Sequence, residues 1–218
     1  FLTSTAALPA MAQAQDEDGW YASASVTVAQ LESTEGTIAN APAPGSTVRT
    51  SNAFETGFGG QVALGRRFGA FRIEAEAGYV RSTQDSYVSI APPTGSIVAD
   101  VKEDELRGMV NGYFDLTRGA VQPYLGAGAG VARVDVDFFA PRAPFPTEAP
   151  RQLIKDGETR FAYQFIGGVA VRVAPKVAFT LQYRWLDAGT IHAKDTRGEA
   201  ITRDHRGHHV DLGLRLRF

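Results

Sequence analysis

Four histidines and an aspartate near the end of the chain are the first candidates for chemistry. Asp204, His205, His208 and His209 form the pattern D-H-x-x-H-H, and His192 precedes them. Imidazole nitrogens and carboxylates are common zinc ligands, so this stretch could hold a metal ion. Histidines in a loop are more often simply solvated, and no serine stands in a matching hydrolase motif. We therefore predict no metal site, no cofactor and no catalytic residue, with a metal site as the alternative.

Two carboxylates on one segment, Glu74 and Glu76, are the second candidate. In a β-strand they share a face, where a carboxylate pair could serve acid–base catalysis. Several arginines occupy matching positions in other segments, so we expect these carboxylates to be neutralised by arginine instead.

Most charged residues recur at alternate positions of apolar segments rather than in a compact motif. Charges enclosed in a dry interior are costly unless they are paired and hydrogen-bonded. We therefore predict an ion-pair network between strands, formed by Glu55, Arg72, Glu74, Glu76, Arg107, Asp115, Arg160, Arg172, Arg184, Asp211, Arg215 and Arg217.

The elements that position these charges are clearest in the final segment, from His208 to Phe218. Its even positions are Val210, Leu212, Leu214, Leu216 and Phe218, whereas its odd positions are His209, Asp211, Gly213, Arg215 and Arg217. Alternation with period two gives a strand with one wholly apolar face and one charged face. A strand of a soluble sheet rarely ends on an apolar-face aromatic residue, so the pattern predicts a lipid-facing strand.

Composition excludes several other classes of protein. The 218 residues have a slightly negative mean hydropathy and no run of about twenty apolar residues, which excludes a helical membrane protein. The 22 basic and 24 acidic residues are dispersed and give a net charge of -2, so we expect no nucleic-acid partner. The absence of cysteine removes disulfides and thiolate chemistry.

Alternation along the whole chain predicts an all-β protein, an eight-stranded antiparallel up-and-down transmembrane β-barrel. The expected strands are 19–31, 54–68, 71–81, 106–116, 121–138, 159–173, 177–185 and 208–218. Short turns around Gly69, Gly119 and Pro175 interleave with four long loops. A change of phase between Ala132 and Val134 predicts a β-bulge. The proline-rich loop 139–157 is expected not to continue the sheet.

Aromatic residues on the apolar face fall at two levels once the short turns are placed in the periplasm. Two aromatic belts around an aliphatic band are typical of a barrel that spans a bilayer. The predicted periplasmic belt is Trp20, Phe68, Phe71, Phe114 and Phe218, and the outer belt is Phe54, Tyr79, Phe161, Tyr183 and Trp185.

Three motifs carry a resemblance to a known family. They are P-Y-L-G-A-G-A-G-V-A at 123–132, Y-Q-F-I-G-G-V-A-V at 163–171 and L-Q-Y-R-W at 181–185. They resemble later strands of the small eight-stranded outer-membrane β-barrels, the Opa/Omp25-like and OmpA-like family. The resemblance implies the outer membrane of a Gram-negative bacterium, with its lipid and lipopolysaccharide as surroundings. It also implies that Phe218 is the insertion signal that the barrel-insertion machinery recognises. Because Phe218 ends the barrel, we expect no peptidoglycan-binding domain.

The resemblance leaves the function open between several roles. An eight-stranded barrel has an interior that side chains can fill, so we expect the ion pairs to plug the lumen. The protein would then be structural or adhesin-like, with a possible host or surface ligand at the external loops. The alternative is a small gated porin-like channel with a weak anion preference, because arginines outnumber carboxylates. A barrel enzyme similar to lipid A-modifying enzymes is a third possibility, but we expect no enzyme.

The first residues resemble the end of a secretory signal peptide. Ala12-Gln13-Ala14 is a small-x-small cleavage pattern in front of the acidic residues 16–18. We predict that residues 1–14 are the remnant of that signal and that residues 15–218 form the outer-membrane β-barrel domain.

Overall fold

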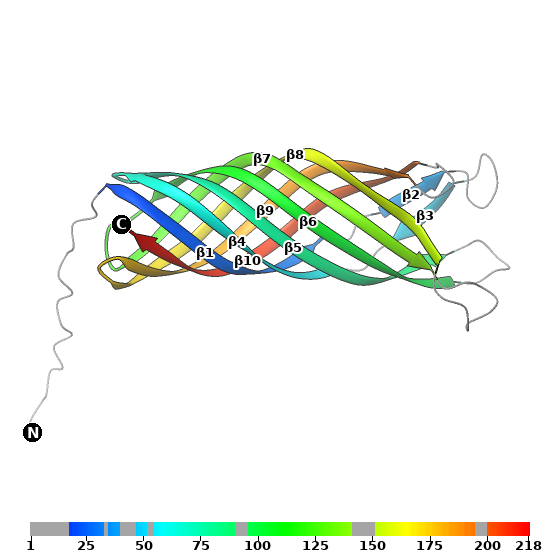
Figure 1. Ribbon diagram of the computed structural model, residues 1–218, viewed down its shortest axis with the longest axis horizontal. Coiled ribbons are helices and arrows are strands. Elements are labelled where there is room, and N and C mark those ends of the chain that lie inside the picture. The colour runs from blue at the N-terminus through cyan, green and yellow to red at the C-terminus, as the bar shows by residue number, and fades with distance from the viewer. Residues whose placement is uncertain are drawn as a thin grey trace, which may run out of the picture.

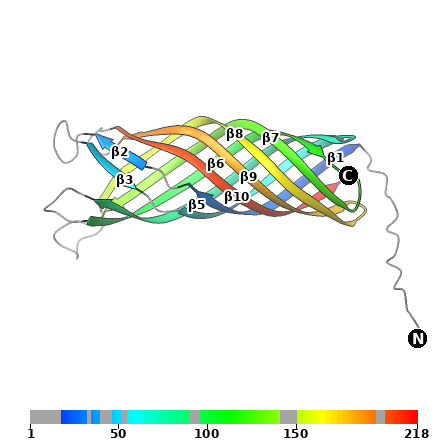
Figure 2. The same cartoon turned by 180° about the vertical axis from the view of Figure 1, so that it is seen from behind.

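The protein folds as a closed antiparallel β-barrel (Figures 1 and 2). The computed structural model describes residues 18–32, 35–39, 47–51, 55–89, 96–140, 151–194 and 200–218. The barrel strands are β1 (Gly19–Leu31), β4 (Glu55–Phe68), β5 (Phe71–Ser89), β6 (Ser96–Asp115), β7 (Val121–Ala140), β8 (Arg151–Ala174), β9 (Val177–Lys194) and β10 (Ala200–Arg217). Neighbours in sequence pair in that order, and β1 pairs with β10 to close the ring. The predicted eight-stranded architecture is confirmed.

A small additional hairpin lies outside the ring. Strands β2 (Glu35–Ala39) and β3 (Thr47–Ser51) pair with each other, and β2 extends the sheet from the outer end of β10 at Ile201 and Thr202. This stretch was predicted to be a loop. Among the described residues, no helix is long and apolar enough to cross a membrane.

All three short turns are where the sequence predicts them, and they lie at the same end as the C-terminus (Figure 1). Gly69 adopts a φ of 61°, a conformation that glycine reaches without the steric cost of a Cβ. Its N–H donates to the Asp18 carboxylate at 2.5 Å, which fastens the first turn to the start of β1. This end is the periplasmic end under the rule that short turns face the periplasm.

The strands are longer at the opposite end than the sequence predicted. Predicted loops 82–104 and 187–206 are largely strand, because β5 pairs with β6 as far as Ser89 and Ser96, and β9 pairs with β10 as far as Lys194 and Ala200. The proline-rich stretch was also predicted too long. The ladder continues to Ala140 and resumes at Arg151, and residues 141–150 lie outside the described part.

The predicted β-bulge between Ala132 and Val134 is wrong. The pairing of β7 with β6 runs without a register shift through Ala132, Arg133 and Val134. Ala132 and Val134 are both buried, while Arg133 is exposed, so side chains keep alternating in one phase. What changes here is the environment, because an apolar residue now faces inward and a charged residue faces outward.

Candidate functional site: the barrel lumen and its two ends

The barrel has apolar residues outside and polar residues inside over most of its length. Outward residues such as Val26, Phe58 and Leu212 are more than half exposed. Inward residues Arg72, Arg107 and Arg184 are among the largest fully buried side chains. Such a distribution suits a hydrocarbon environment outside the barrel and a hydrogen-bonded interior.

Arg184 forms the centre of the interior network. Its guanidinium contacts both oxygens of Glu76, with Nη2 donating to Oε2 at 3.1 Å. It also donates to Gln164 at 2.8 Å, to Gln61 at 2.7 Å and to Asp211 at 3.3 Å. Arg184 lies on β9 and Glu76 on β5, four places apart in a ring of eight strands. The pair therefore spans the full width of the lumen.

Arg107 forms a second crossing at a neighbouring level. It donates to Glu76 at 3.3 Å and to Glu105 at 2.8 Å, and both carboxylates are buried. Its Nη1 also contacts Nδ1 of His209 on the opposite strand at 3.3 Å. Because arginine can only donate, His209 accepts this hydrogen bond as a neutral imidazole.

His205 forms a third crossing toward the outer end. Its Nδ1 lies 3.0 Å from Glu103 and its Nε2 lies 2.6 Å from Glu105, both on β6 opposite β10. At this level the outward residues are Arg81, Asp104 and Arg206, which are charged, so the site lies beyond the apolar band. Burial alone would lower the pKa of His205, but Glu103 and Glu105 together raise the pKa of His205 to about 10. The imidazole is therefore doubly protonated at neutral pH.

Arginine side chains crowd the periplasmic end. Arg67 and Arg72 share the buried carboxylate of Asp115, with Arg72 Nε at 3.0 Å from Oδ1. Arg215 lies against the rings of Tyr21 and Tyr124, with its guanidinium carbon 5.3 Å and 5.4 Å from their centroids.

The structure places the other predicted charged residues as follows. Glu74 is buried and accepts a hydrogen bond from Tyr113 at 3.0 Å, so Glu74 and Glu76 have separate partners. Arg160 is partly exposed and pairs with Glu158 at 3.2 Å. Arg172 and Arg217 are also partly exposed and lie around the periplasmic recess. The side chain of Glu55 lies outside the described part.

Several interior residues were missing from the prediction. Arg67 was overlooked although its odd number matches the inward phase of β4, so alternation alone could have found it. Glu103 and His205 fell in predicted loops, and Glu105 fell just outside the predicted strand 106–116, because the apolar outward positions do not reach them. Their inward position follows only from the continued ladder of β6 and β10.

His205 lies on β10 rather than in the predicted loop before residue 208. His208 and His209 lie on the same strand, in agreement with the predicted strand 208–218. His205 and His209 point into the lumen, whereas His208 is on the outer face, where it contacts Tyr183 at 2.6 Å and Glu32 at 3.0 Å. Strand alternation therefore separates them. Within the described residues, no group of three or more histidines and carboxylates could hold a metal ion. The side chain of His192 lies outside the described part.

The aromatic residues predicted for the two belts lie on the outer surface of the barrel wherever they are described. Trp20, Phe68, Phe71, Phe114 and Phe218 are exposed near the periplasmic end, and Tyr79, Phe161 and Tyr183 are exposed toward the outer end. Trp185 is partly covered because it stacks on Phe165, with ring centroids 6.0 Å apart. Phe54 lies outside the described residues. Arg66 places its guanidinium over Trp20 and Phe68, as a long cation does at an interface.

The fold, the inverted polarity and the aromatic residues together define a small barrel that spans a membrane. The model of the family described as the outer membrane protein beta-barrel domain matches residues 1–218. The chain belongs to this family, and its location is the bacterial outer membrane. The predicted resemblance to small outer-membrane barrels is confirmed.

Solved structures with the same fold are similar over nearly the whole chain. Neisserial surface protein A is 18% identical, with 92% of this chain and 97% of that chain covered and a TM-score of 0.50. OprG from Pseudomonas aeruginosa is 13% identical, with 92% and 97% covered and a TM-score of 0.56. AlkL, solved in lipid bilayers, is 15% identical, with 100% and 95% covered and a TM-score of 0.53. At these identities the likeness shows the fold.

Curated relatives match a shorter part of the chain. Uncharacterized proteins of Brucella abortus (strain 2308) and Brucella suis biovar 1 (strain 1330) are each 35% identical over 98 residues, 43% of this chain. The match spans 34% of the length of these relatives.

Proposed function

We propose that this outer-membrane barrel is a closed, non-enzymatic scaffold that presents its outer end for contact with other surfaces. The observation that carries the proposal is the ion pair between Arg184 and Glu76, which joins opposite walls of the lumen. The crossings by Arg107 to His209 and by His205 to Glu105 lie beside it and toward the outer end. A solute would have to break several buried charge-assisted hydrogen bonds in turn to pass.

The outer end supports the surface role. Beyond the outer belt Val80, Val134, Leu186 and Ala188 are buried inside the barrel together with the ion-paired His205, Glu103 and Glu105, while the outward Arg81 and Arg133 pair with Asp104 and Asp135. A barrel wall with charged side chains outside and apolar or ion-paired side chains inside is stable in water. The strands would therefore continue into the external medium as a collar, at the end opposite the C-terminus (Figure 2).

A conductance measurement distinguishes this proposal from the alternative of a small gated channel, which the excess of arginines over carboxylates in the lumen suggested. Protein refolded from detergent and inserted into planar bilayers should give no steady openings. A variant with Arg184→Ser and Glu76→Ser should open the lumen, because two long side chains that span it are removed. Steady large openings of the unmodified protein, selective for anions, would refute the plug and favour the channel.

The surface role is tested by a binding assay on cells that display the protein. Cells displaying the protein are compared with cells displaying a variant in which residues 141–150 are replaced by a Gly-Ser linker of equal length. Greater adhesion of the unmodified protein to host cells or matrix would support the role. Equal adhesion of both, at equal surface amounts, to every surface tested would count against this loop as the adhesive part.

Export, assembly and the lack of catalysis belong to the same proposal. Residues 1–14, outside the described part, would be removed as a signal peptide, which the N-terminal sequence of protein purified from outer membranes tests directly. Lipopolysaccharide and other lipids would surround the barrel, and Phe218 would be recognised by the barrel-insertion machinery. A change in lipid A mass on expression would contradict the non-enzymatic role.

A further inference from the structure

Two opposite charges in the lumen have no direct ion-pair partner. Glu74 on β5 is 5% exposed, and Arg215 on β10 is 7% exposed. Within the described part of the chain neither residue takes part in a salt bridge, whereas Arg107 and Arg184 are paired with carboxylates of the same lumen. A buried charge without a partner is costly, so Glu74 and Arg215 need another form of compensation.

The direct contacts of these two side chains leave hydrogen-bonding capacity unused. Glu74 accepts one hydrogen bond, from the hydroxyl group of Tyr113 at 3.0 Å. The guanidinium carbon of Arg215 lies 5.3 Å and 5.4 Å from the ring centroids of Tyr21 and Tyr124, and its Nε has no hydrogen-bond partner among the described residues. Aromatic faces attract a cation without accepting its N–H groups as an oxygen would. Arg215 therefore keeps a buried donor, and Glu74 keeps acceptor sites on its carboxylate.

Glu74 and Arg215 line the same cavity in the lumen, together with polar residues such as Ser25, Gln182 and Asp211. The volume of this cavity is about 20 Å³. By the same measure, a cavity needs about 10–15 Å³ to hold one water molecule, and the water needs two to four polar partners. The cavity therefore fits one water molecule in both size and chemistry, and it leaves no room for a hydrated ion.

We propose that this cavity binds a water molecule that bridges Glu74 and Arg215. The water oxygen accepts a hydrogen bond from Nε–H of Arg215, and one water O–H group donates to the carboxylate of Glu74. A bridge of this kind is nearly as favourable in enthalpy as a direct hydrogen bond. It allows the two opposite charges to stabilise each other across the cavity.

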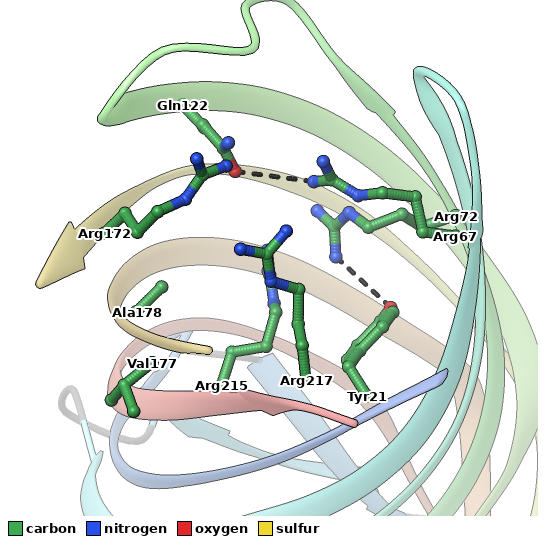
Figure 3. A pocket seen from close by; sticks show the side chains of 9 residues that line it. All are labelled: Tyr21, Arg67, Arg72, Gln122, Arg172, Val177, Ala178, Arg215 and Arg217. Atoms are coloured by element: carbon green, nitrogen blue, oxygen red, sulfur yellow. Dashed lines mark hydrogen bonds between the residues drawn. The ribbon is translucent and has the colours of Figure 1, made fainter. Parts of the chain in front are cut away.

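The periplasm is the source of this water. Arg215 is the one residue that lines both this cavity and the periplasmic recess, where Figure 3 shows it next to Tyr21. Glu76 follows two residues after Glu74 on the same face of β5 and is paired with Arg184, so water that enters past Arg215 stops at that ion pair. The dry part of the plug then begins at Arg184 and Glu76. This limit rests on the proposed plug, whereas the water site does not.

NMR of the ¹⁵N-labelled protein in lipid nanodiscs tests the water site directly. Rotating-frame NOEs between water and the Nε–H groups of arginine report which guanidinium groups contact water. Arg184 is the internal control, because its Nε is also buried without a hydrogen-bond partner among the described residues but does not line this cavity. We expect a water contact at Arg215 and none at Arg184. No contact at Arg215, or equal contacts at both, would overturn the site.

A double-mutant cycle tests whether the water couples the two charges. Urea midpoints are measured in lipid vesicles for Glu74→Gln, Arg215→Gln and the double variant, and we expect the double variant to lose less than the sum of the single losses. In the matched control cycle, Glu74→Gln with the exposed Arg133→Gln, the losses should add. Additive losses for Glu74 and Arg215 would overturn the bridge. Coupling without a water contact at Arg215 would mean that the side chains meet directly, and it would overturn the bridge as well.

Discussion

Replacement of Arg184 by methionine tests whether the lumen is held by its central ion pair. The side chain is fully buried and donates to Glu76, Gln61, Gln164 and Asp211, so the change removes five hydrogen bonds at once. Removal of one partner from a buried ion pair typically costs about 3–5 kcal/mol, because the other charge is left without compensation. Glu76 keeps its contacts with Arg107 and Asn111, which places the expected loss near the lower limit, about 3 kcal/mol.

Urea titration of the protein folded in lipid vesicles, followed by tryptophan fluorescence, gives the free energy of unfolding. A double-mutant cycle with Glu76→Met isolates the pair, since an apolar replacement of both partners is far less costly than loss of one. The double variant should recover about 1–2 kcal/mol of the summed losses. Arg133→Met is the matched control, because its pair with Asp135 is exposed, and it should change nothing measurable. Strict additivity in the cycle, or an Arg184 loss below about 1 kcal/mol, would refute the plug as a cooperative network.

Three further predictions concern pH, backbone contact and assembly. The pKa of His205 is raised from 6.5 in the unfolded chain to about 10, so its contribution to stability is complete below pH 6.5 and is lost as pH rises through 10; unfolding free energies should fall across that window in the unmodified protein and less in His205→Gln. A parallel pH dependence in both proteins would contradict this assignment. Gly59→Val should prevent refolding, since a Cβ there would lie 2.0 Å from the backbone oxygen of Tyr79, whereas Gly108→Val meets open space and should refold normally by gel mobility. Phe218→Ala should reduce the amount assembled in outer membranes of cells but not refolding into vesicles, and equal loss in both assays would assign Phe218 a structural role instead.

The sequence could predict which side chains face the lumen, but it could not predict which residues pair across the lumen. Alternation placed Arg184 inward as soon as Tyr183 was assigned to the outer face, and the same rule holds for Arg72 and Glu76. Which carboxylate Arg184 meets depends on the stagger of the strands around the ring, which no single strand pattern contains. The pairs Arg184–Glu76 and His205–Glu105 could therefore be identified only from the closed barrel.

The strand ends were missed for a different physical reason. The predicted strands end close to where the apolar outward residues end, at Tyr79 on β5 and Leu106 on β6. Beyond those residues the ladder continues with charged outward residues such as Arg81 and Asp104, while the inward side is mixed, with Val80 beside Glu103 and Glu105. Val134 shows this change most clearly. Its even position predicted a β-bulge on the assumption that apolar residues face outward, whereas Val134 in fact faces inward.

The change in the outward residues locates the outer membrane boundary from the protein alone. Met109, Ala132, Ala162 and Ala188 form a small apolar cluster in the lumen beside Arg107, which is the register partner of Ala132. Around the same level, the outward residues pass from Tyr79 to Arg81 and from Val131 to Arg133. A barrel wholly in lipid would have no reason to place charged side chains on its outer face, whereas a barrel that enters water can do so because the charges are hydrated there. The interior at this end, where Val80, Val134 and Leu186 lie with the His205–Glu103–Glu105 cluster, supports the proposal that the strands continue into water as a surface-presenting scaffold.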